Sequence, residues 1–207
     1  MNGYGSYTMN ARLDALKDQM SACGSCDLCK TRTQVVFGDG SHEPLIMIVG
    51  EGPGEEEDLK GLPFIGRAGQ KLDSILSYLG VTRQDIYITN AVLCRPPNNR
   101  TPRKEEMDAC KWRLDLQIKL LRPKLIILLG RTALEQFKGE PIKGALNQFF
   151  FDRVGKSDGW LHYRVDDHES KVLVTYHPSY HLRSPDKAYR ETLPHWQKVK
   201  QWVKTSC

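Results

Sequence analysis

Short, uninterrupted apolar runs alternate along this chain with longer segments whose apolar residues recur at helical spacing. The runs have the length of strands and read LIMIV (45–49), IYIT (86–89), LIILL (125–129) and VLVTY (172–176). Continuous apolar character is typical of strands that are buried on both faces, as in parallel sheets covered by helices. The alternation predicts an α/β fold, a single three-layer α/β/α domain with a central, mostly parallel sheet.

Helices with one apolar face are predicted between these runs. They are expected over 11–20, over 69–79 with Gly80 as the C-cap, from Thr101 and Pro102 to Leu121, through Leu134 and Phe137, and from Thr192 and Pro194 onward. Weaker signals predict a short strand in QVVFGDG (34–40). They also predict a hairpin in which FFFDRV and LHYRV flank turn residues 155–159. We expect residues 1–10 to be a flexible N-terminal lead and residues 11–207 to be one domain.

Composition and charge narrow the class of protein. The chain has 207 residues and a net charge of +5, which is a mild indication of an anionic partner such as nucleic acid. It has no apolar run long enough to cross a membrane, and its first residues lack the pattern of a secretory signal. We therefore expect a cytoplasmic protein with no membrane partner.

Polar and glycine-rich motifs follow three of the predicted strands. GEGPGEEED and GLPFIGRAG follow LIMIV, Asn90 follows IYIT, and His177 follows VLVTY. Ligands of open α/β sheets bind beyond the carboxyl ends of the strands, so these motifs predict one common site. Each also has a plainer explanation: a structural turn for the glycine loop, an Asx-turn or cap for Asn90, and a structural role for His177.

The residue types at this edge suit a planar base. The glycine loop lacks the patterns of a P-loop and of a dinucleotide fingerprint, and its acidic run argues against a simple phosphate cradle. Phe64 between Pro63 and Gly66 could stack on a base. The Asn90 amide pairs an acceptor with a donor, which complements the O4 and N3–H edge of uracil and mismatches cytosine. His177 could donate a hydrogen bond to a leaving group that gains negative charge.

Cysteines form the strongest single signal. CGSCDLC offers two overlapping C-x-x-C pairs, Cys23 with Cys26 or Cys26 with Cys29, and Cys94 and Cys110 follow later. Four thiolates suit either a zinc ion or a 4Fe–4S cluster, and the spacing does not separate the two. Cys110 also fits the apolar face of its predicted helix, where it could be a plain buried thiol.

Together these motifs resemble the iron–sulfur uracil-DNA glycosylases, families 4 and 5, over most of the chain. The matching segments occur in family order: C-x-x-C with TRTQVVFGDG, GEGPGEEED with GLPFIGRAG, YITNAVLCRPPNNRTP, Cys110, LIILLG and TYHPSYHLR. The acids of the first motif favour family 4. The resemblance implies a monofunctional DNA repair enzyme that hydrolyses the N-glycosidic bond of uracil in single- or double-stranded DNA, acting as a monomer.

The resemblance also implies roles for individual residues. It assigns a 4Fe–4S cluster to Cys23, Cys26, Cys94 and Cys110, and it leaves Cys29 out. In the pocket, it implies that Phe64 stacks on a flipped uracil, Asn90 reads the uracil edge and His177 lies near O2. Glu51 and Gly52 line the pocket, Glu57 or Glu51 acts on water, and the implied DNA contacts are Arg95, Arg100, Leu182 and Arg183.

Two departures and two rival functions accompany this interpretation. The chain has GALNQFFFDRV where the family usually has an Arg-Gly pair, and it has His181 where an apolar residue is common. We expect His181 to alter the surface that meets the duplex. The rival functions are a non-catalytic nucleic-acid-binding protein that keeps the fold and cluster, and a zinc-stabilised binding module.

Overall fold

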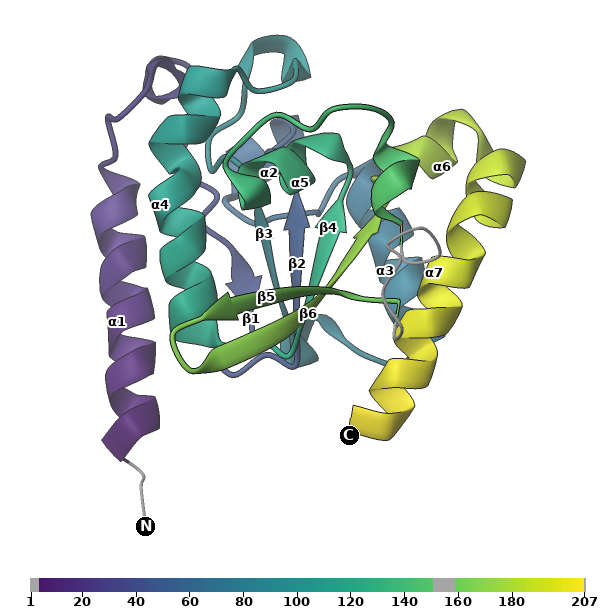
Figure 1. Cartoon of the computed structure of the whole chain (residues 1–207). Helices are drawn as coiled ribbons and strands as arrows, with labels where there is room; N and C mark the ends of the chain where they lie inside the picture. Colours follow the sequence, from purple (N-terminus) through teal and green to yellow (C-terminus); the bar gives the residue numbers. More distant parts are fainter. Residues whose placement is uncertain (1–3, 151–158, 207) are drawn as a thin grey trace.

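A mixed sheet of six strands forms the centre of the computed structural model, which describes residues 4–150 and 159–206 (Figure 1). The strand order is β1-β3-β2-β4-β6-β5. Strands β3, β2, β4 and β6 run parallel, and the edge strands β1 and β5 are antiparallel to their neighbours. The bounds are Asp39–Gly40 for β1, Ile46–Gly50 for β2, Ile86–Asn90 for β3, Leu125–Leu129 for β4, Leu161–Val165 for β5 and His168–Thr175 for β6. The predicted α/β fold with a mostly parallel sheet is confirmed.

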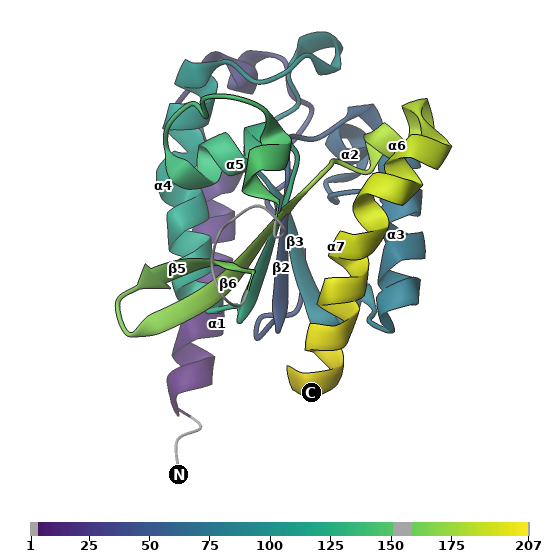
Figure 2. The ribbon, with the colours of Figure 1, turned by 45° about the vertical axis from the view of Figure 1, so that its right-hand side comes forward.

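Helices cover both faces of the sheet (Figures 1 and 2). One face carries α1 (Tyr4–Ser21), α4 (Lys104–Leu121) and α5 (Arg131–Lys138), and the other carries α3 (Arg67–Leu79) and α7 (Pro185–Ser206). Alternate residues of one strand enter different cores, because side chains alternate across a sheet. Met47 packs with the first group of helices, whereas Ile46 and Ile48 pack with the second. This two-sided burial explains why the central strands are apolar throughout.

Two helices begin at places that the local signals do not predict. Helix α4 begins at Lys104 rather than at Thr101, because the Glu106 carboxylate accepts a hydrogen bond from the Arg103 N–H at 2.7 Å and caps the helix there. Helix α7 begins at Pro185, and Pro194 lies inside it. Proline is well suited to the first turn of a helix, so Pro185 supplies the start that was predicted at Thr192 and Pro194.

The N-terminal helix and the hairpin also differ from expectation. Helix α1 begins at Tyr4 and not at residue 11, so most of the predicted lead is helical. Strand LHYRV pairs with β6 across the turn at Asp166 and Asp167. The predicted turn at 155–159 and the end of FFFDRV lie, except for Gly159, outside the described residues. In QVVFGDG only β1 pairs with the sheet, because Gly38 and Gly40 have φ values of 141° and 124° that bend the chain.

The acidic run of the glycine loop is a short helix, α2 (Glu55–Lys60). All four acids of its first turn lie at the helix N-terminus, where the positive end of the helix dipole favours negative charge. Gly61 ends the helix in the left-handed conformation, with φ of 74°. The loop then turns through Phe64 into α3. The dense charge of this stretch therefore stabilises the backbone and does not oppose a ligand.

Two glycines allow the loop to approach the end of the sheet. A Cβ at Gly50 would collide with the Asn90 amide oxygen and would come within 2.5 Å of Phe64 Cζ. A Cβ at Gly69 would overlap the carbonyl group of Phe64. Only glycine fits at these positions without moving the Phe64 loop.

Gly69→Ala is therefore expected to lower the free energy of unfolding by about 2 kcal/mol or more, because a methyl group must push away backbone and not a flexible side chain. Urea unfolding followed by circular dichroism measures the change. The control is Gln70→Ala, at an exposed position of the same helix, which should change the stability by at most about 0.5 kcal/mol. Equal stabilities for the two variants would contradict the close packing at Gly69.

Candidate active site

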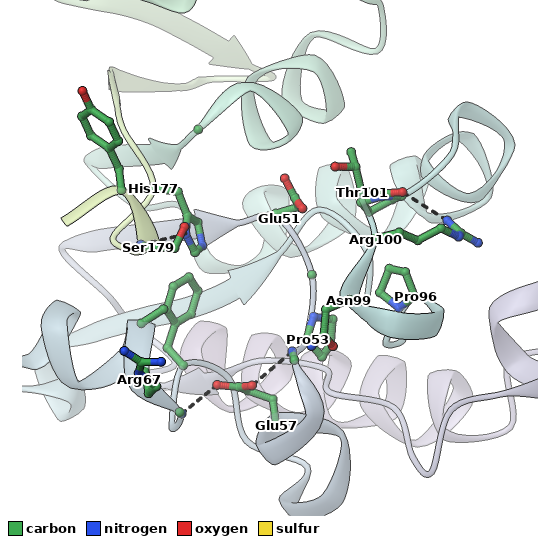
Figure 3. Close-up of a pocket in the computed structure, with 18 of the residues that line it drawn as sticks. Glu51, Pro53, Glu57, Arg67, Pro96, Asn99, Arg100, Thr101, His177 and Ser179 are labelled. Carbon is green, nitrogen blue, oxygen red and sulfur yellow. Dashed lines mark hydrogen bonds between the residues drawn. The ribbon is translucent and has the colours of Figure 1, made fainter. Parts of the chain in front are cut away.

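A cavity of about 860 Å³ opens at the carboxyl end of the parallel strands (Figure 3). The segments that follow β2, β3, β4 and β6 all contribute to its lining. These include the glycine loop from Glu51 to Ala68, residues between Pro96 and Pro102, Gly130 and Arg131, and residues between Tyr176 and Arg183. The cavity is thus at the edge where the sequence predicted that the motifs would meet.

Phe64 and His177 form one wall of this cavity. Their ring centroids are 5.6 Å apart and the rings are tilted by 32°. Phe64 has a φ of 54°, which is unusual for a bulky residue. Arg83 holds the backbone there by donating to the carbonyl groups of Pro63, at 3.0 Å, and Phe64. The ring is consequently presented by a backbone that is fixed on both sides.

Asn90 lies behind this wall, at the end of β3. Its side chain is buried beside Gly50 and Phe64, and it does not line the cavity. The amide oxygen has no hydrogen-bond partner within the described protein. A buried acceptor without a donor costs about 1–3 kcal/mol, so this atom marks a place where a ligand N–H would be stabilised. An Asx-turn, the plainer explanation of Asn90, requires an amide oxygen that accepts a backbone hydrogen bond, and here it accepts none.

His177 points a nitrogen that can donate toward the cavity. Its Nδ1 accepts a hydrogen bond from the Ser179 N–H at 3.2 Å, which places the proton of the neutral ring on Nε2. Burial, together with the charge of Arg183, lowers the pKa of His177 to about 4, and the charge of Glu57 opposes the shift. The ring is therefore a neutral donor at physiological pH.

Glu51 is the carboxylate that the structure leaves available. One oxygen, Oε2, accepts a hydrogen bond from the Thr132 hydroxyl at 2.7 Å, and the side chain lines the cavity. In the view of Figure 3 the carboxylate lies between His177 on one side and Thr101 on the other. A single neutral donor orients the group and leaves its second oxygen able to accept a proton from a water molecule.

Glu57 has a different environment. Its Oε2 accepts from the Gly54 N–H at 3.1 Å, and its Oε1 accepts from the N–H groups of Ile65 and Gly66 at 3.0 and 2.8 Å. The dashed lines in Figure 3 run from Glu57 to this backbone. The carboxylate joins the start of α2 to the turn that carries Phe64, so its oxygens are already occupied by backbone donors.

The predicted DNA contacts have unequal surroundings. Arg100 forms two hydrogen bonds to the buried Glu106, at 2.6 and 2.8 Å, and Arg95 contacts Asn99 and Glu55. Arg183 lines the cavity from an exposed position, and Leu182 beside it is 41% exposed. Arg183 and Leu182 are thus open to a partner, whereas Arg100 is held by a carboxylate.

His181 differs from the expectation that it would alter this surface. It is buried, and its Nε2 lies 3.0 Å from the Thr192 hydroxyl, which donates to the Ala188 carbonyl group. The hydroxyl hydrogen is used in that bond, so His181 donates from Nε2. His181 therefore anchors the short helix α6 (Ser179–Arg183) on α7 and leaves Leu182 outward.

Four of the cysteines come together beside this site. Cys94 and Cys110 are buried, and Cys23 and Cys26 pack against the same core. Burial raises the pKa of Cys26, and the charges of Cys110 and Cys23 raise it further. Burial also raises the pKa of Cys94 to about 11, although Arg32 donates a hydrogen bond to its sulfur at 3.1 Å. These shifts keep Cys26 and Cys94 as neutral thiols, and a bound cation would favour their thiolate forms.

Four cysteine thiols suit two kinds of occupant. A single zinc ion needs all its sulfurs about 2.3 Å from one point, whereas a 4Fe–4S cluster bonds each thiolate to a different iron. Among the residues that the structure describes, no three His, Cys, Asp or Glu side chains are placed to hold a metal ion. The chemistry of the donor set fits either group.

Sequence reasoning missed three residues that act on the site. Thr132 orients Glu51, Arg83 holds the Phe64 turn, and Arg67 lines the cavity at the exposed start of α3. Thr132 follows Gly130 at the end of β4, so the rule that located the other motifs could have found it. Arg83 lies in a separate turn, and its sequence carries no sign of the contact.

Comparison with known proteins gives consistent matches. Residues 37–204 match the model of the uracil DNA glycosylase superfamily. A type-4 uracil-DNA glycosylase of Thermotoga maritima is 41% identical over 96% of this chain and 98% of its own length. One of Archaeoglobus fulgidus is 39% identical over 84% of each chain. A type-5 uracil-DNA glycosylase of Thermus thermophilus is 33% identical, over 48% of this chain and 52% of its own.

The lowered pKa of His177 has a measurable consequence. An unfolded histidine binds a proton near pH 6.5, and folded His177 binds one only near pH 4, so protons favour the unfolded chain within that window. We expect NMR of the ring to show a neutral imidazole with Nε2–H at pH 6. Stability should fall between pH 6.5 and 4 more steeply than in His177→Asn. A ring that titrates near pH 6.5 would contradict this environment.

Proposed function

This chain belongs to the uracil DNA glycosylase superfamily, and we infer that it is a uracil-DNA glycosylase that releases uracil from DNA and leaves an abasic site. Its similarity to the type-4 enzymes extends over almost the whole chain. The observation that carries the assignment of the site is the buried, unpartnered oxygen of Asn90 beside the ring of Phe64. Uracil presents an N3–H group to such an acceptor, and cytosine does not.

We propose that uracil is bound by stacking and by reading of its edge. Phe64 stacks on the base, Asn90 Oδ1 accepts from N3–H, and Glu51 and Gly52 border the pocket. Because Asn90 lies behind the Phe64 ring, the ring has to shift for the base to reach it. Extrusion of the base from the duplex costs a few kcal/mol, and less from a mismatch or a single strand.

The proposed chemistry is hydrolysis of the bond between C1′ and N1. The bonding electron pair moves to N1, and the negative charge spreads to the oxygens of uracil. His177 donates its Nε2–H to O2, which stabilises that charge without a prior change of protonation. Glu51 accepts a proton from the water whose oxygen adds to C1′. Glu57 does not act on the water in this scheme, because it holds the turn that presents Phe64.

Two further features of the proposal follow from the residues present. The described residues that line the cavity include no lysine, so we propose that no Schiff base forms with the sugar and that strand cleavage does not accompany base release. Arg183 and Leu182, with Arg67 beside them, are proposed to contact the DNA, and Arg95 and Arg100 to support the loop after Asn90. We propose that the protein acts as a monomer.

We propose that Cys23, Cys26, Cys94 and Cys110 hold a 4Fe–4S cluster. When bound, the cluster supplies a covalent brace between the segment that follows α1, the loop after β3 and helix α4. This brace supports the loop that borders the cavity at Pro96 to Pro102. The electrostatic contact among these four thiols supports the assignment. Cys29 is not among the charges that act on Cys26 or Cys94.

None of the described helices has both the length and the apolar character that crossing a bilayer requires. A non-catalytic protein that binds nucleic acid with the same fold is the alternative function. It would bind uracil-containing DNA without releasing the base. The neutral His177 donor and the available oxygen of Glu51 favour catalysis over this alternative.

The function is tested with a labelled oligonucleotide that contains one uracil. The protein should produce alkali-labile abasic sites and no direct strand break. Glu51→Gln should lower kcat at least about 100-fold, which is the usual contribution of a general base. Glu57→Gln should keep kcat within about tenfold and lower the thermal stability, because its NH2 group faces at least one backbone N–H donor that the carboxylate accepts from.

If folded protein leaves the uracil-containing DNA intact, the proposed activity is contradicted. A larger loss of kcat in Glu57→Gln than in Glu51→Gln, at equal folded fraction, would reverse the roles of the two carboxylates.

The metal is tested by the colour and iron content of the purified protein. We expect a brown protein that absorbs broadly near ~400 nm and contains about four irons per chain. Cys110→Ser should lose the iron, and Cys29→Ser, the matched control, should keep it. A colourless protein that contains zinc would reject the cluster, and loss of iron in Cys29→Ser would reject this set of ligands.

A further inference from the structure

Helix α4 carries a fully buried arginine that reaches the strand end behind the pocket. The two terminal nitrogens of Arg113 divide their contacts. Nη2 donates to the carbonyl groups of Asn90 and Ala91 at 3.1 and 3.0 Å, and Nη1 donates to Gln117 at 2.8 Å. The guanidinium thus holds the backbone of the residue whose amide reads the base in the proposed function.

The same arginine is close in sequence to a cysteine of the proposed metal site. Cys110 is one turn earlier on α4. Burial lowers the pKa of Arg113, and the groups that oppose the shift are Cys110, Tyr87 and Cys94. Burial raises the pKa of Tyr87, which therefore stays neutral. Cys110 and Arg113 are both buried and lie three residues apart, which makes them neighbours on one face of α4. The buried Nε of Arg113 has no hydrogen-bond partner among the described residues.

We propose that Arg113 is a positioning residue that links the metal-bearing thiolates to the edge that reads uracil. The part of this inference that concerns the reading of uracil rests on the proposed function. Four thiolates around a 4Fe–4S cluster or a zinc ion carry net negative charge, which compensates the buried guanidinium. The compensated arginine then fixes the carbonyl groups of Asn90 and Ala91, and with them the direction of the Asn90 side chain.

The link has two physical parts that different substitutions separate. The positive charge stabilises the thiolates, and any cation of similar length supplies it. The planar fork binds two carbonyl groups at once, and lysine, with a single ammonium group, cannot reproduce that geometry. A buried charge without its partner is strongly destabilising, so loss of the metal should disturb the Asn90 strand end through Arg113.

The test compares Arg113→Met and Arg113→Lys with the unmodified protein, all with bound metal. Two quantities are measured: kcat/KM for uracil release and the rate at which a chelator removes the metal. Arg113→Met should lower kcat/KM and speed metal loss, each by about tenfold, since a charge-assisted hydrogen bond contributes about that factor. Arg113→Lys should restore slow metal loss and leave kcat/KM low.

Ile118→Ala is the control for general damage to α4, because Ile118 is fully buried on the same helix and carries no charge and no hydrogen-bonding side chain. At a temperature where it is folded, both quantities should stay within about twofold of the unmodified protein. If Arg113 had a purely structural role, Arg113→Met and Ile118→Ala would change kcat/KM and the rate of metal loss alike. Arg113→Lys would then change both quantities together.

Metal retention and kcat/KM that both match the unmodified protein in Arg113→Met would overturn the proposal. If Arg113→Met does not fold, Arg113→Lys decides: normal metal retention with low kcat/KM supports the link, and normal values of both overturn it. If the unmodified protein releases no uracil, the proposed function fails and the uracil half fails with it. The chelator comparison then still tests whether Arg113 stabilises the thiolates.

Discussion

The close approach of two chain segments at Gly50 is the constraint on which the site depends. The Phe64 ring and the Asn90 amide meet above this residue, where no side chain fits. The approach places an aromatic face next to a buried acceptor that the protein leaves unpaired. Such an acceptor destabilises the folded chain by about 1–3 kcal/mol, and a ligand with a matching donor recovers that loss. One of the buried polar atoms that the described protein leaves unpaired is thus the atom where a base is proposed to bind.

The loop that makes this approach is held by polar contacts to its backbone. Glu57 accepts hydrogen bonds from three N–H groups at the two ends of the loop, and Arg83 donates to the carbonyl groups of Pro63 and Phe64. These contacts stabilise a turn in which a bulky residue, Phe64, has a positive φ. They also explain why two neighbouring glutamates differ: Glu57 is occupied by the loop, and Glu51, held only by Thr132, faces the cavity.

Two arginines bring positive charge to the four cysteines of the proposed metal site. Four thiols and two arginines, Arg32 and Arg113, share one side of the sheet, and the arginines carry positive charge toward the sulfurs. Arg113 also bonds to the backbone of Asn90. In the role proposed for Arg113, a group bound by the cysteines acts on the backbone of Asn90 through this side chain.

The sequence by itself determined the α/β fold, the parallel strands and the edge where the motifs gather, because continuous apolar runs and strand-end glycines report on local structure. It placed Glu51, Phe64 and His177 at one cavity. Tertiary structure decided the rest. The start of α4 depends on Glu106, and the partner of LHYRV depends on strand pairing across a turn. Which glutamate is free, and what Arg113 holds, depend on contacts between residues far apart in sequence, which no local pattern encodes.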